Sequence, residues 1–224
     1  MSARRAVLLV GSARPRGTGN SEAIGNYLLS RLAEGGMDTE VLYVSRTQRP
    51  EKEQQLLQAV EGADLFVLST PLYVDALPYL VTRSAERIAA HRTAMPEPSE
   101  VGFLALVNCG FPEWEHTKTA LEICRVFARQ SGFRWMGGLG YGAGEAIGGR
   151  SLEEVGSLIR SLRQGLDLAA EALLAGRPIP EEAQTLLARP MVPSRLYTVL
   201  GSIGWLRAAR RNGTLGKLGD RPLG

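Results

Sequence analysis

The chain has 224 residues, of which 44% are hydrophobic and 22% charged, fractions that are ordinary for a soluble globular protein. Its 26 basic and 23 acidic residues give a net charge of +3, an excess too small to indicate a nucleic-acid-binding protein. Two cysteines exclude a disulfide scaffold, and no apolar run approaches the roughly 20 residues of a membrane span. We therefore expect a cytoplasmic, reduced protein.

The first elements expected are a buried strand and a helix joined by a polar loop. Residues 6–10 are an unbroken apolar run, and apolar residues recur at helical spacing over 24–32. The loop between them, 11–21, carries glycines, hydroxyl groups, an amide and two arginines. Unpaired amides at a helix start, together with the helix dipole, favour an anion. The junction predicts a site for a phosphate monoester; alternatively, Asn20 or Ser21 only caps the helix.

Four further strand-like runs follow, and each leads into a helical pattern. The spacing predicts strands at 39–44, 65–68, 101–107 and 133–141. The last helix is expected to be long, because Ser151 and Glu154 have the spacing of a capping box and the apolar stripe continues to Leu173. Alternating strands and helices indicate an α/β fold with a parallel sheet and right-handed crossovers.

Strand composition predicts the order of the sheet. The first, third and fourth strands are apolar on both faces, whereas the second and fifth contain polar residues or glycine. Because edge strands tolerate such residues, we predict the order 2-1-3-4-5; the order 3-2-1-4-5 would expose the apolar third strand. In the predicted order, ligands bind beyond the carboxyl ends of strands one and three. The loops at 11–21 and 69–78 leave these two strands.

These two loops carry a family resemblance. The segments GSAR at 11–14, NS at 20–21 and STPLYVDALP at 69–78 resemble the NAD(P)H-dependent FMN reductase family of flavodoxin-like proteins, over roughly 6–176. The resemblance implies a flavodoxin-like three-layer sandwich that holds the FMN phosphate in the first loop and the ring in the later ones. The cofactor-binding residues that it implies are Ser12, Arg14, Thr18, Gly19, Asn20, Ser21, Pro71, Leu72, Tyr73, Val74, Asn108, Cys109, Gly110, Phe111, Gly142 and Gly144.

The chain differs from the family in one respect: segment 14–20 is two residues longer. The related iron–sulfur flavoproteins are excluded because Cys109 and Cys124 cannot form their compact cysteine cluster. His91 and His116 have no neighbour at metal-ligand spacing, so we assign no metal ligand.

The function implied by the resemblance is an FMN-dependent NAD(P)H oxidoreductase. Hydride would pass from NADH or NADPH to FMN and on to a small acceptor such as a quinone or a flavin, with no catalytic residue assigned. The alternative is a flavodoxin-type electron carrier without turnover, although carriers with basic partners use acidic surfaces and this chain is basic. A dinucleotide-binding Rossmann protein is excluded because the Gly-x-Gly-x-x-Gly spacing is absent and 43–46 contains no acid.

The C-terminal region is expected to be an addition to the flavin-binding domain. We place that domain at 1–178 and a basic, partly helical extension at 179–224. Within it, residues 189–224 contain seven basic residues and one acidic residue, a net charge of +6. Its helix would serve as an arm in a homodimer or pack on its own domain, readings that we favour over contact with a membrane surface. The apolar face consists of Leu196, Val199, Leu200, Ile203, Leu206 and Ala209.

Overall fold

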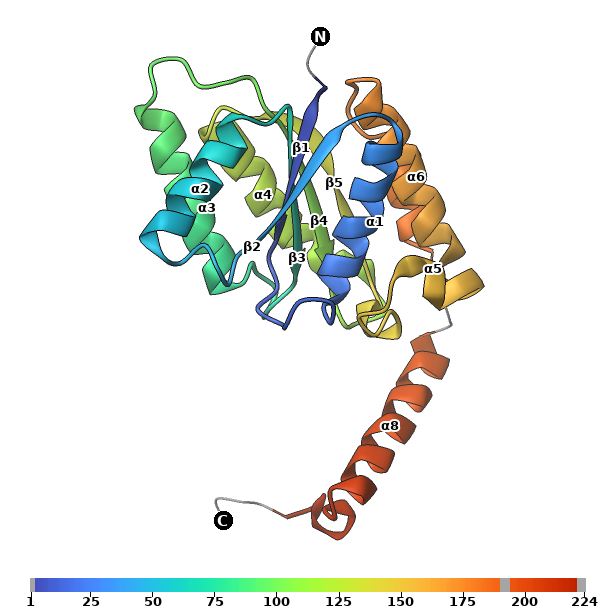
Figure 1. The fold of residues 1–224 in the computed structure, drawn as a ribbon. Helices are drawn as coiled ribbons and strands as arrows, with labels where there is room; N and C mark the ends of the chain where they lie inside the picture. Colours follow the sequence, from blue (N-terminus) through green and yellow to red (C-terminus); the bar gives the residue numbers. More distant parts are fainter. Residues whose placement is uncertain (1–2, 190–193, 221–224) are drawn as a thin grey trace.

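The protein folds around one parallel five-stranded sheet. The computed structural model describes residues 3–189 and 194–220. All four strand pairs are parallel, and the order is β2-β1-β3-β4-β5, as predicted (Figure 1). The strands are β1 (Arg5–Val10), β2 (Asp38–Tyr43), β3 (Leu65–Pro71), β4 (Gly102–Asn108) and β5 (Arg134–Tyr141).

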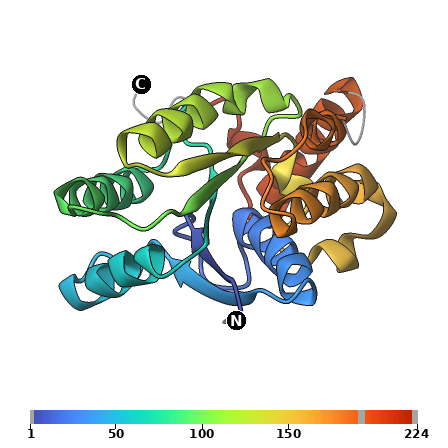
Figure 2. The ribbon, with the colours of Figure 1, turned by 90° about the horizontal axis from the view of Figure 1, so that it is seen from above.

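Helices cover both faces of the sheet and make the three-layer sandwich that the sequence predicts. Figure 2 shows α1 and α6 on one face and α2, α3 and α4 on the other. The helix bounds are α1 (Asn20–Glu34), α2 (Pro50–Glu61), α3 (Tyr79–Ala94), α4 (Lys118–Gln130), α5 (Leu152–Val155), α6 (Arg160–Leu174), α7 (Glu181–Leu187) and α8 (Ser194–Arg211).

Each face has its own apolar core, and the central strands contribute to both. In β1, Leu8 and Val10 face the core under α1 and α6, while Val7 and Leu9 face the core under α2 and α3. Successive side chains of a strand point to opposite faces. A strand covered on both sides must therefore be apolar at every position, which is why β1, β3 and β4 read as unbroken apolar runs.

The prediction of one long helix after Ser151 is wrong. The capping box is present, because the Glu154 amide donates to Ser151 Oγ at 3.3 Å and the Ser151 amide donates to Glu154 Oε2 at 3.3 Å. However, α5 ends after one turn, and a 3-10 turn from Gly156 to Ile159 separates it from α6. Gly156 has φ 77°, a left-handed conformation that an α-helix does not contain.

Helix α8 extends away from the sheet on the side where the strands have their carboxyl ends (Figure 1). Trp205 is 82% exposed, and Val199, Ile203 and Leu206 are exposed as well. For the part of the helix whose side chains the structure describes, the reading in which it packs on its own domain is therefore wrong; the side chains of Leu196 and Leu200 lie outside the described residues. None of the helices within the described residues is long and apolar enough to cross a membrane.

The short helix that precedes α8 in the chain, α7, packs against α6 and β5.

Candidate functional site

The loops that follow β1, β3 and β4 meet at the carboxyl end of the sheet and enclose a small cavity of about 90 Å³. Ten of the sixteen residues that the resemblance implied line it, together with an acid that sequence reasoning missed. The lining residues are Ser12, Arg14, Asn20, Ser21, Pro71, Leu72, Tyr73, Asn108, Cys109, Gly110 and Glu145.

One wall of the cavity is the start of α1. The helix begins at Asn20 with Gly19 as its N-cap, and no side chain caps it. The Ala23 amide donates to the Gly19 carbonyl at 3.0 Å, whereas within the described chain the amides of Asn20, Ser21 and Glu22 have no intramolecular acceptor. Uncapped amides at the positive end of a helix dipole form a binding site for an anion of phosphate size.

Asn20 and Ser21 connect α1 to other loops and do not cap the helix. The side chain of Asn20 accepts a hydrogen bond from the Gly149 amide at 2.8 Å. Ser21 Oγ donates to Asn108 Oδ1 at 2.6 Å, and both side chains are buried. The alternative reading of this junction, in which either residue acts only as a cap, is therefore wrong.

The charged residues at the cavity are Arg14 and Glu145. The Arg14 amide donates to Ser12 Oγ at 3.2 Å, and its guanidinium forms an ion pair with Glu145 at 3.4 Å. Both side chains are more than half exposed, and an exposed pair contributes about 1 kcal/mol or less. The pair can therefore separate when a phosphate competes for Arg14.

A buried acid, Glu22, holds the lengthened loop that precedes α1. Glu22 is 7% exposed and accepts a hydrogen bond from the Gly17 amide at 2.7 Å and another from the Tyr43 hydroxyl at 2.6 Å. The Arg16 guanidinium lies 4.7 Å from the centre of the Tyr43 ring. Burial and the hydrogen bond to Glu22 raise the pKa of Tyr43. The longer loop is thus ordered by residues from both α1 and β2.

The loop after β3 contains a strained turn. Tyr73 and Ala76 exchange backbone hydrogen bonds of 3.0 and 3.1 Å around Val74 and Asp75. These two have φ values of 50° and 57°, the left-handed conformation of a type I′ turn, which disfavours a β-branched residue such as Val74. Backbone strain of this kind clusters at functional sites. Val74 is 98% exposed and lies outside the cavity, whereas Tyr73 lines it.

Two of the implied residues, Gly142 and Gly144, support the loop after β4 from behind. The Ala143 amide donates to the Phe111 carbonyl at 2.6 Å, and the Gly144 amide donates to the Cys109 carbonyl at 2.9 Å. A Cβ atom on Gly142 would collide with the carbonyl oxygen of Pro112. Both positions therefore need glycine for close backbone packing and lie outside the lining of the cavity.

Three further implied residues also lie outside the cavity. Thr18 and Gly19 line a neighbouring polar pocket of about 570 Å³ beside Glu22. The ring of Phe111 is exposed and lies 4.9 Å from the ring of His116. Phe111 therefore stands at the open rim of the site.

The cysteine in the cavity is not an activated nucleophile. Cys109 is buried, and burial raises the pKa of its thiol. Its Sγ lies 3.5 Å from each of the carbonyl oxygens of Phe111 and Glu113. Among the residues that the structure describes, no cluster of three or more His, Cys, Asp or Glu side chains could bind a metal ion.

The sheet order and the position of the cavity beside β1 and β3 define a flavodoxin-like fold. No family model and no curated protein matches the chain. Among solved structures, a Streptococcus pneumonia TIGR4 flavodoxin is similar, with 19% identity, a TM-score of 0.52 and coverage of 78% of this chain and 99% of that one.

Two oxidoreductase structures are similar to a comparable degree. An FMN-dependent NADH-azoreductase from Bacillus anthracis, solved with FMN, has 11% identity and a TM-score of 0.52 over 76% of this chain and 99% of that one. An NAD(P)H:quinone oxidoreductase from Methanothermobacter marburgensis has 15% identity and a TM-score of 0.51 over 63% and 86%. Identities this low demonstrate the shared fold alone.

Proposed function

We propose that this chain is a flavoprotein that binds FMN beside β1, β3 and β4 and catalyses NAD(P)H-dependent reduction of a small acceptor. The observation that carries the proposal is the uncapped start of α1, which faces a cavity lined by Ser12 and Arg14. A phosphate there accepts hydrogen bonds from the Asn20, Ser21 and Glu22 amides, and Arg14 neutralises part of its charge.

The site residues fit the phosphate of FMN and its ring at two different places. The cavity of about 90 Å³ suits a phosphate-sized group and is well below the roughly 300 Å³ of a common ligand pocket. The flavin ring would then have to lie outside the cavity, where the exposed side chains of Tyr73 and Phe111 could hold it. Leu72 keeps the rim in place, because its amide donates to the Asn108 carbonyl at 2.8 Å.

FMN, when bound, supplies the redox chemistry by accepting hydride from a nicotinamide and releasing electrons to an acceptor. The chain's own residues bind the phosphate, hold the three loops together and leave one side of the rim open to substrates. We assign no catalytic role to Cys109, because burial raises the pKa of its thiol and favours the protonated form. The acceptor class that we propose is a quinone, a free flavin or another small electrophile.

The similar fold of azoreductases and of an NAD(P)H:quinone oxidoreductase supports this activity. We propose residues 1–178 as the flavin-binding domain and 179–224 as its extension, in a homodimer. The competing function is a flavodoxin-type carrier, which one matched structure represents. A carrier would bind FMN but would not oxidise NADH or NADPH in repeated turnovers.

Anaerobic mixing tests the activity. The protein loaded with FMN is mixed with NADH or NADPH, and the flavin absorbance is followed. We expect bleaching within seconds with one of the two, and continued oxidation of the nicotinamide when a quinone is added. Bleaching by neither nucleotide contradicts the proposed activity, while bleaching without turnover favours the carrier.

A further inference from the structure

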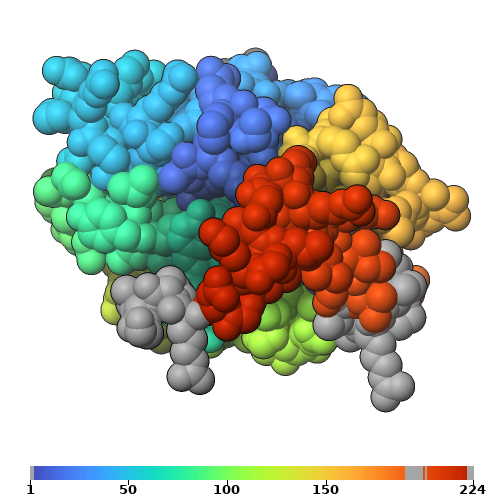
Figure 3. Space-filling view, turned by 90° about the horizontal axis from the view of Figure 1, so that it is seen from below, coloured from blue at the N-terminus to red at the C-terminus, as the bar shows by residue number. Residues whose placement is uncertain are grey.

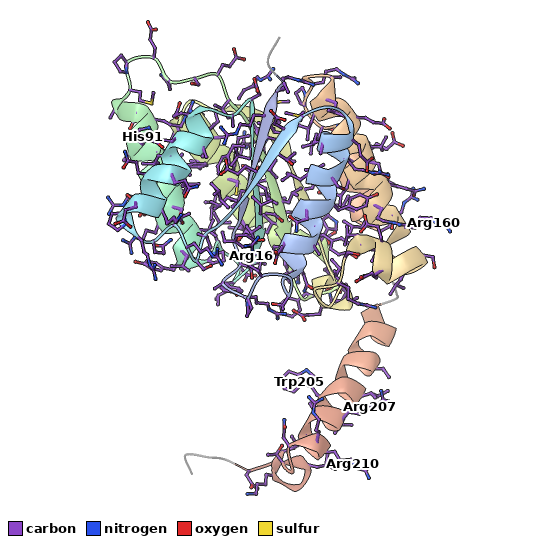
Figure 4. All side chains as sticks on the ribbon, in the orientation of Figure 1. Arg16, His91, Arg160, Trp205, Arg207 and Arg210 are labelled. Carbon is purple, nitrogen blue, oxygen red and sulfur yellow. The ribbon has the colours of Figure 1, made fainter. Side chains whose placement is uncertain are left out.

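The exposed apolar stripe of α8 ends in arginines. Val199, Ile203, Leu206 and Arg210 follow the spacing i, i+4, i+7 and i+11, so they share one side of the helix. The three apolar side chains are exposed. Figure 4 shows Arg207 and Arg210 near the outer end of α8. The helix thus presents an exposed apolar side at Val199, Ile203 and Leu206 and a basic C-terminal end, and neither has a partner within the described chain.

The chain also contains an apolar groove, on the face of the sheet that α3 and α4 cover. The groove lies between α3 and α4 and has a volume of about 440 Å³. Its apolar surface includes Ala85 and Ala89 from α3 and Ile123, Val126 and Phe127 from α4. Ile123 and Val126 are exposed although they are β-branched apolar residues. An apolar surface of this kind marks an interaction site.

The groove and the helix have opposite charges. Glu86 and Glu122 line the groove, and the pair between Glu122 and Arg125 is more than half exposed, so another arginine can compete for it. Helix α8 contains four arginines and no acid. Residues 1–188 have 19 basic and 22 acidic residues, a net charge of −3, whereas the remainder of the chain carries +6.

The dimensions of the two surfaces also agree. At 1.5 Å per residue, the 18 residues of α8 span about 27 Å, the 16 of α3 about 24 Å and the 13 of α4 about 20 Å. Within the groove, Glu86 lies between Ala85 and Ala89 in α3, and Glu122 directly precedes Ile123 in α4. An α8 helix lying along α3 and α4 therefore has both acids and apolar side chains within its length.

We propose that α8 of one copy docks into the α3–α4 groove of a second copy, so that two copies exchange these helices in a symmetric dimer. The chain's own α8 does not occupy this groove, because α8 projects from the carboxyl edge of the sheet (Figures 1 and 3), whereas the groove lies between α3 and α4. In this dimer, the exposed stripe of each copy is buried in the groove of the other copy. It is independent of flavin binding.

The first test is the mass of full-length variants, measured by light scattering after size-exclusion chromatography. We expect the unaltered protein to elute as a dimer, and Ile203→Asp and Val126→Asp each to elute as a monomer with an unchanged far-ultraviolet spectrum. The matched control is Gly201→Asp, two residues from Ile203 and on the opposite side of α8, where a Cβ would meet nothing within 4 Å. This variant should remain a dimer.

The second test exchanges charges between the two surfaces. One variant carries Arg207→Glu and Arg210→Glu, and the other carries Glu86→Arg and Glu122→Arg. Each alone has like charges on α8 and in the groove and should be monomeric. An equimolar mixture restores both complementary contacts and should give a heterodimer.

Any of three results would overturn the proposal. The first is a monomeric mass for the unaltered protein at micromolar concentration. Alternatively, Ile203→Asp stays dimeric while Val126→Asp does not, which means that the groove binds another part of the second copy. Finally, the unaltered protein is a monomer that binds vesicles of phosphatidylserine and phosphatidylcholine through Ile203, which assigns α8 to a lipid surface. None of these results bears on the NAD(P)H assay.

Discussion

Tyr43 donates a hydrogen bond of 2.6 Å to Glu22, and this contact joins the end of β2 to the first turn of α1. The second oxygen of Glu22 accepts from the Gly17 amide at 2.7 Å. One buried carboxylate thus satisfies two donors, and an amide in its place would set its own N–H₂ group against one of them. Leaving a buried donor unsatisfied costs about 1–3 kcal/mol.

We therefore predict that Glu22→Gln weakens FMN binding about tenfold or more and lowers the free energy of unfolding by about 1–3 kcal/mol. The measurements are quenching of FMN fluorescence and urea unfolding. Glu34→Gln on the same helix is the control, because Glu34 is largely exposed. Unchanged FMN affinity in Glu22→Gln would show that the longer loop does not position the phosphate.

Ser21 and Asn108 form the second contact that holds the site together. Ser21→Ala leaves the buried Asn108 Oδ1 without its donor, so we predict a loss of about 1–3 kcal/mol in stability and weaker FMN binding. A double-mutant cycle with Asn108→Ala should give a coupling energy of about 0.5–3 kcal/mol. Ser30→Ala, at an exposed serine on the same helix, serves as the control. Additive effects of Ser21→Ala and Asn108→Ala would mean that the contact does not contribute.

The left-handed turn at Val74 and Asp75 predicts stabilising substitutions. Val74→Asn and Asp75→Gly place in each position a residue that tolerates positive φ, and each should stabilise the protein by about 1 kcal/mol. For a chain of this size that is about 2–4 °C in Tm. Ala76→Gly, at a neighbouring position without positive φ, should lower the Tm. A lower Tm in both turn variants would contradict the assigned turn.

Two glycines near the site, Gly142 and Gly110, differ in the space that is available for an added methyl group. Gly142→Ala forces a Cβ against the Pro112 carbonyl, so it should lower both stability and FMN affinity. At Gly110, a Cβ would meet only Glu145 Cγ at 3.8 Å, an ordinary contact. Gly110→Ala should therefore leave the Tm unchanged and lower FMN affinity alone, because Gly110 lines the cavity. Equal loss of stability in both variants would be inconsistent with this packing.

The buried thiols predict a dependence of stability on pH. Burial raises the pKa of Cys124 to about 12 and also raises that of Cys109. The folded chain then holds these protons at a pH where the unfolded chain has lost them, so stability falls as pH rises above the ordinary thiol range of about 8.5. Urea unfolding at neutral and alkaline pH measures the effect. Cys124→Ala should reduce the alkaline loss; an unchanged loss would assign it to other groups, such as Tyr27.

The sheet order could be predicted from the sequence because the composition of each strand reflects how far that strand is buried. A strand covered on both faces is apolar throughout, as in β1, whereas β2 carries exposed Asp38 and Thr39 at the edge of the sheet. The site loops could be located for the same reason: each follows a recognisable strand, and parallel strands end at one edge.

The contacts within the site were beyond the sequence because they join distant segments. Glu22 reads as an ordinary acid in a first helical turn until folding brings Tyr43 beside it. Glu145 reaches Arg14 only through the turn after β5, 131 positions along the chain. The break at Gly156 was also missed, since an isolated glycine in an apolar stripe is compatible with a continuous helix.

The central claim is that the start of α1 holds a flavin by its phosphate, and a comparison of FMN with riboflavin tests it most directly. Riboflavin has the same ring but no phosphate. Two or three charge-assisted hydrogen bonds, at about 1.5–3 kcal/mol each, predict that FMN binds roughly 100-fold more tightly or better, and that Arg14→Ala narrows the gap. Equal affinities for the two flavins, or no binding of either, would contradict the claim.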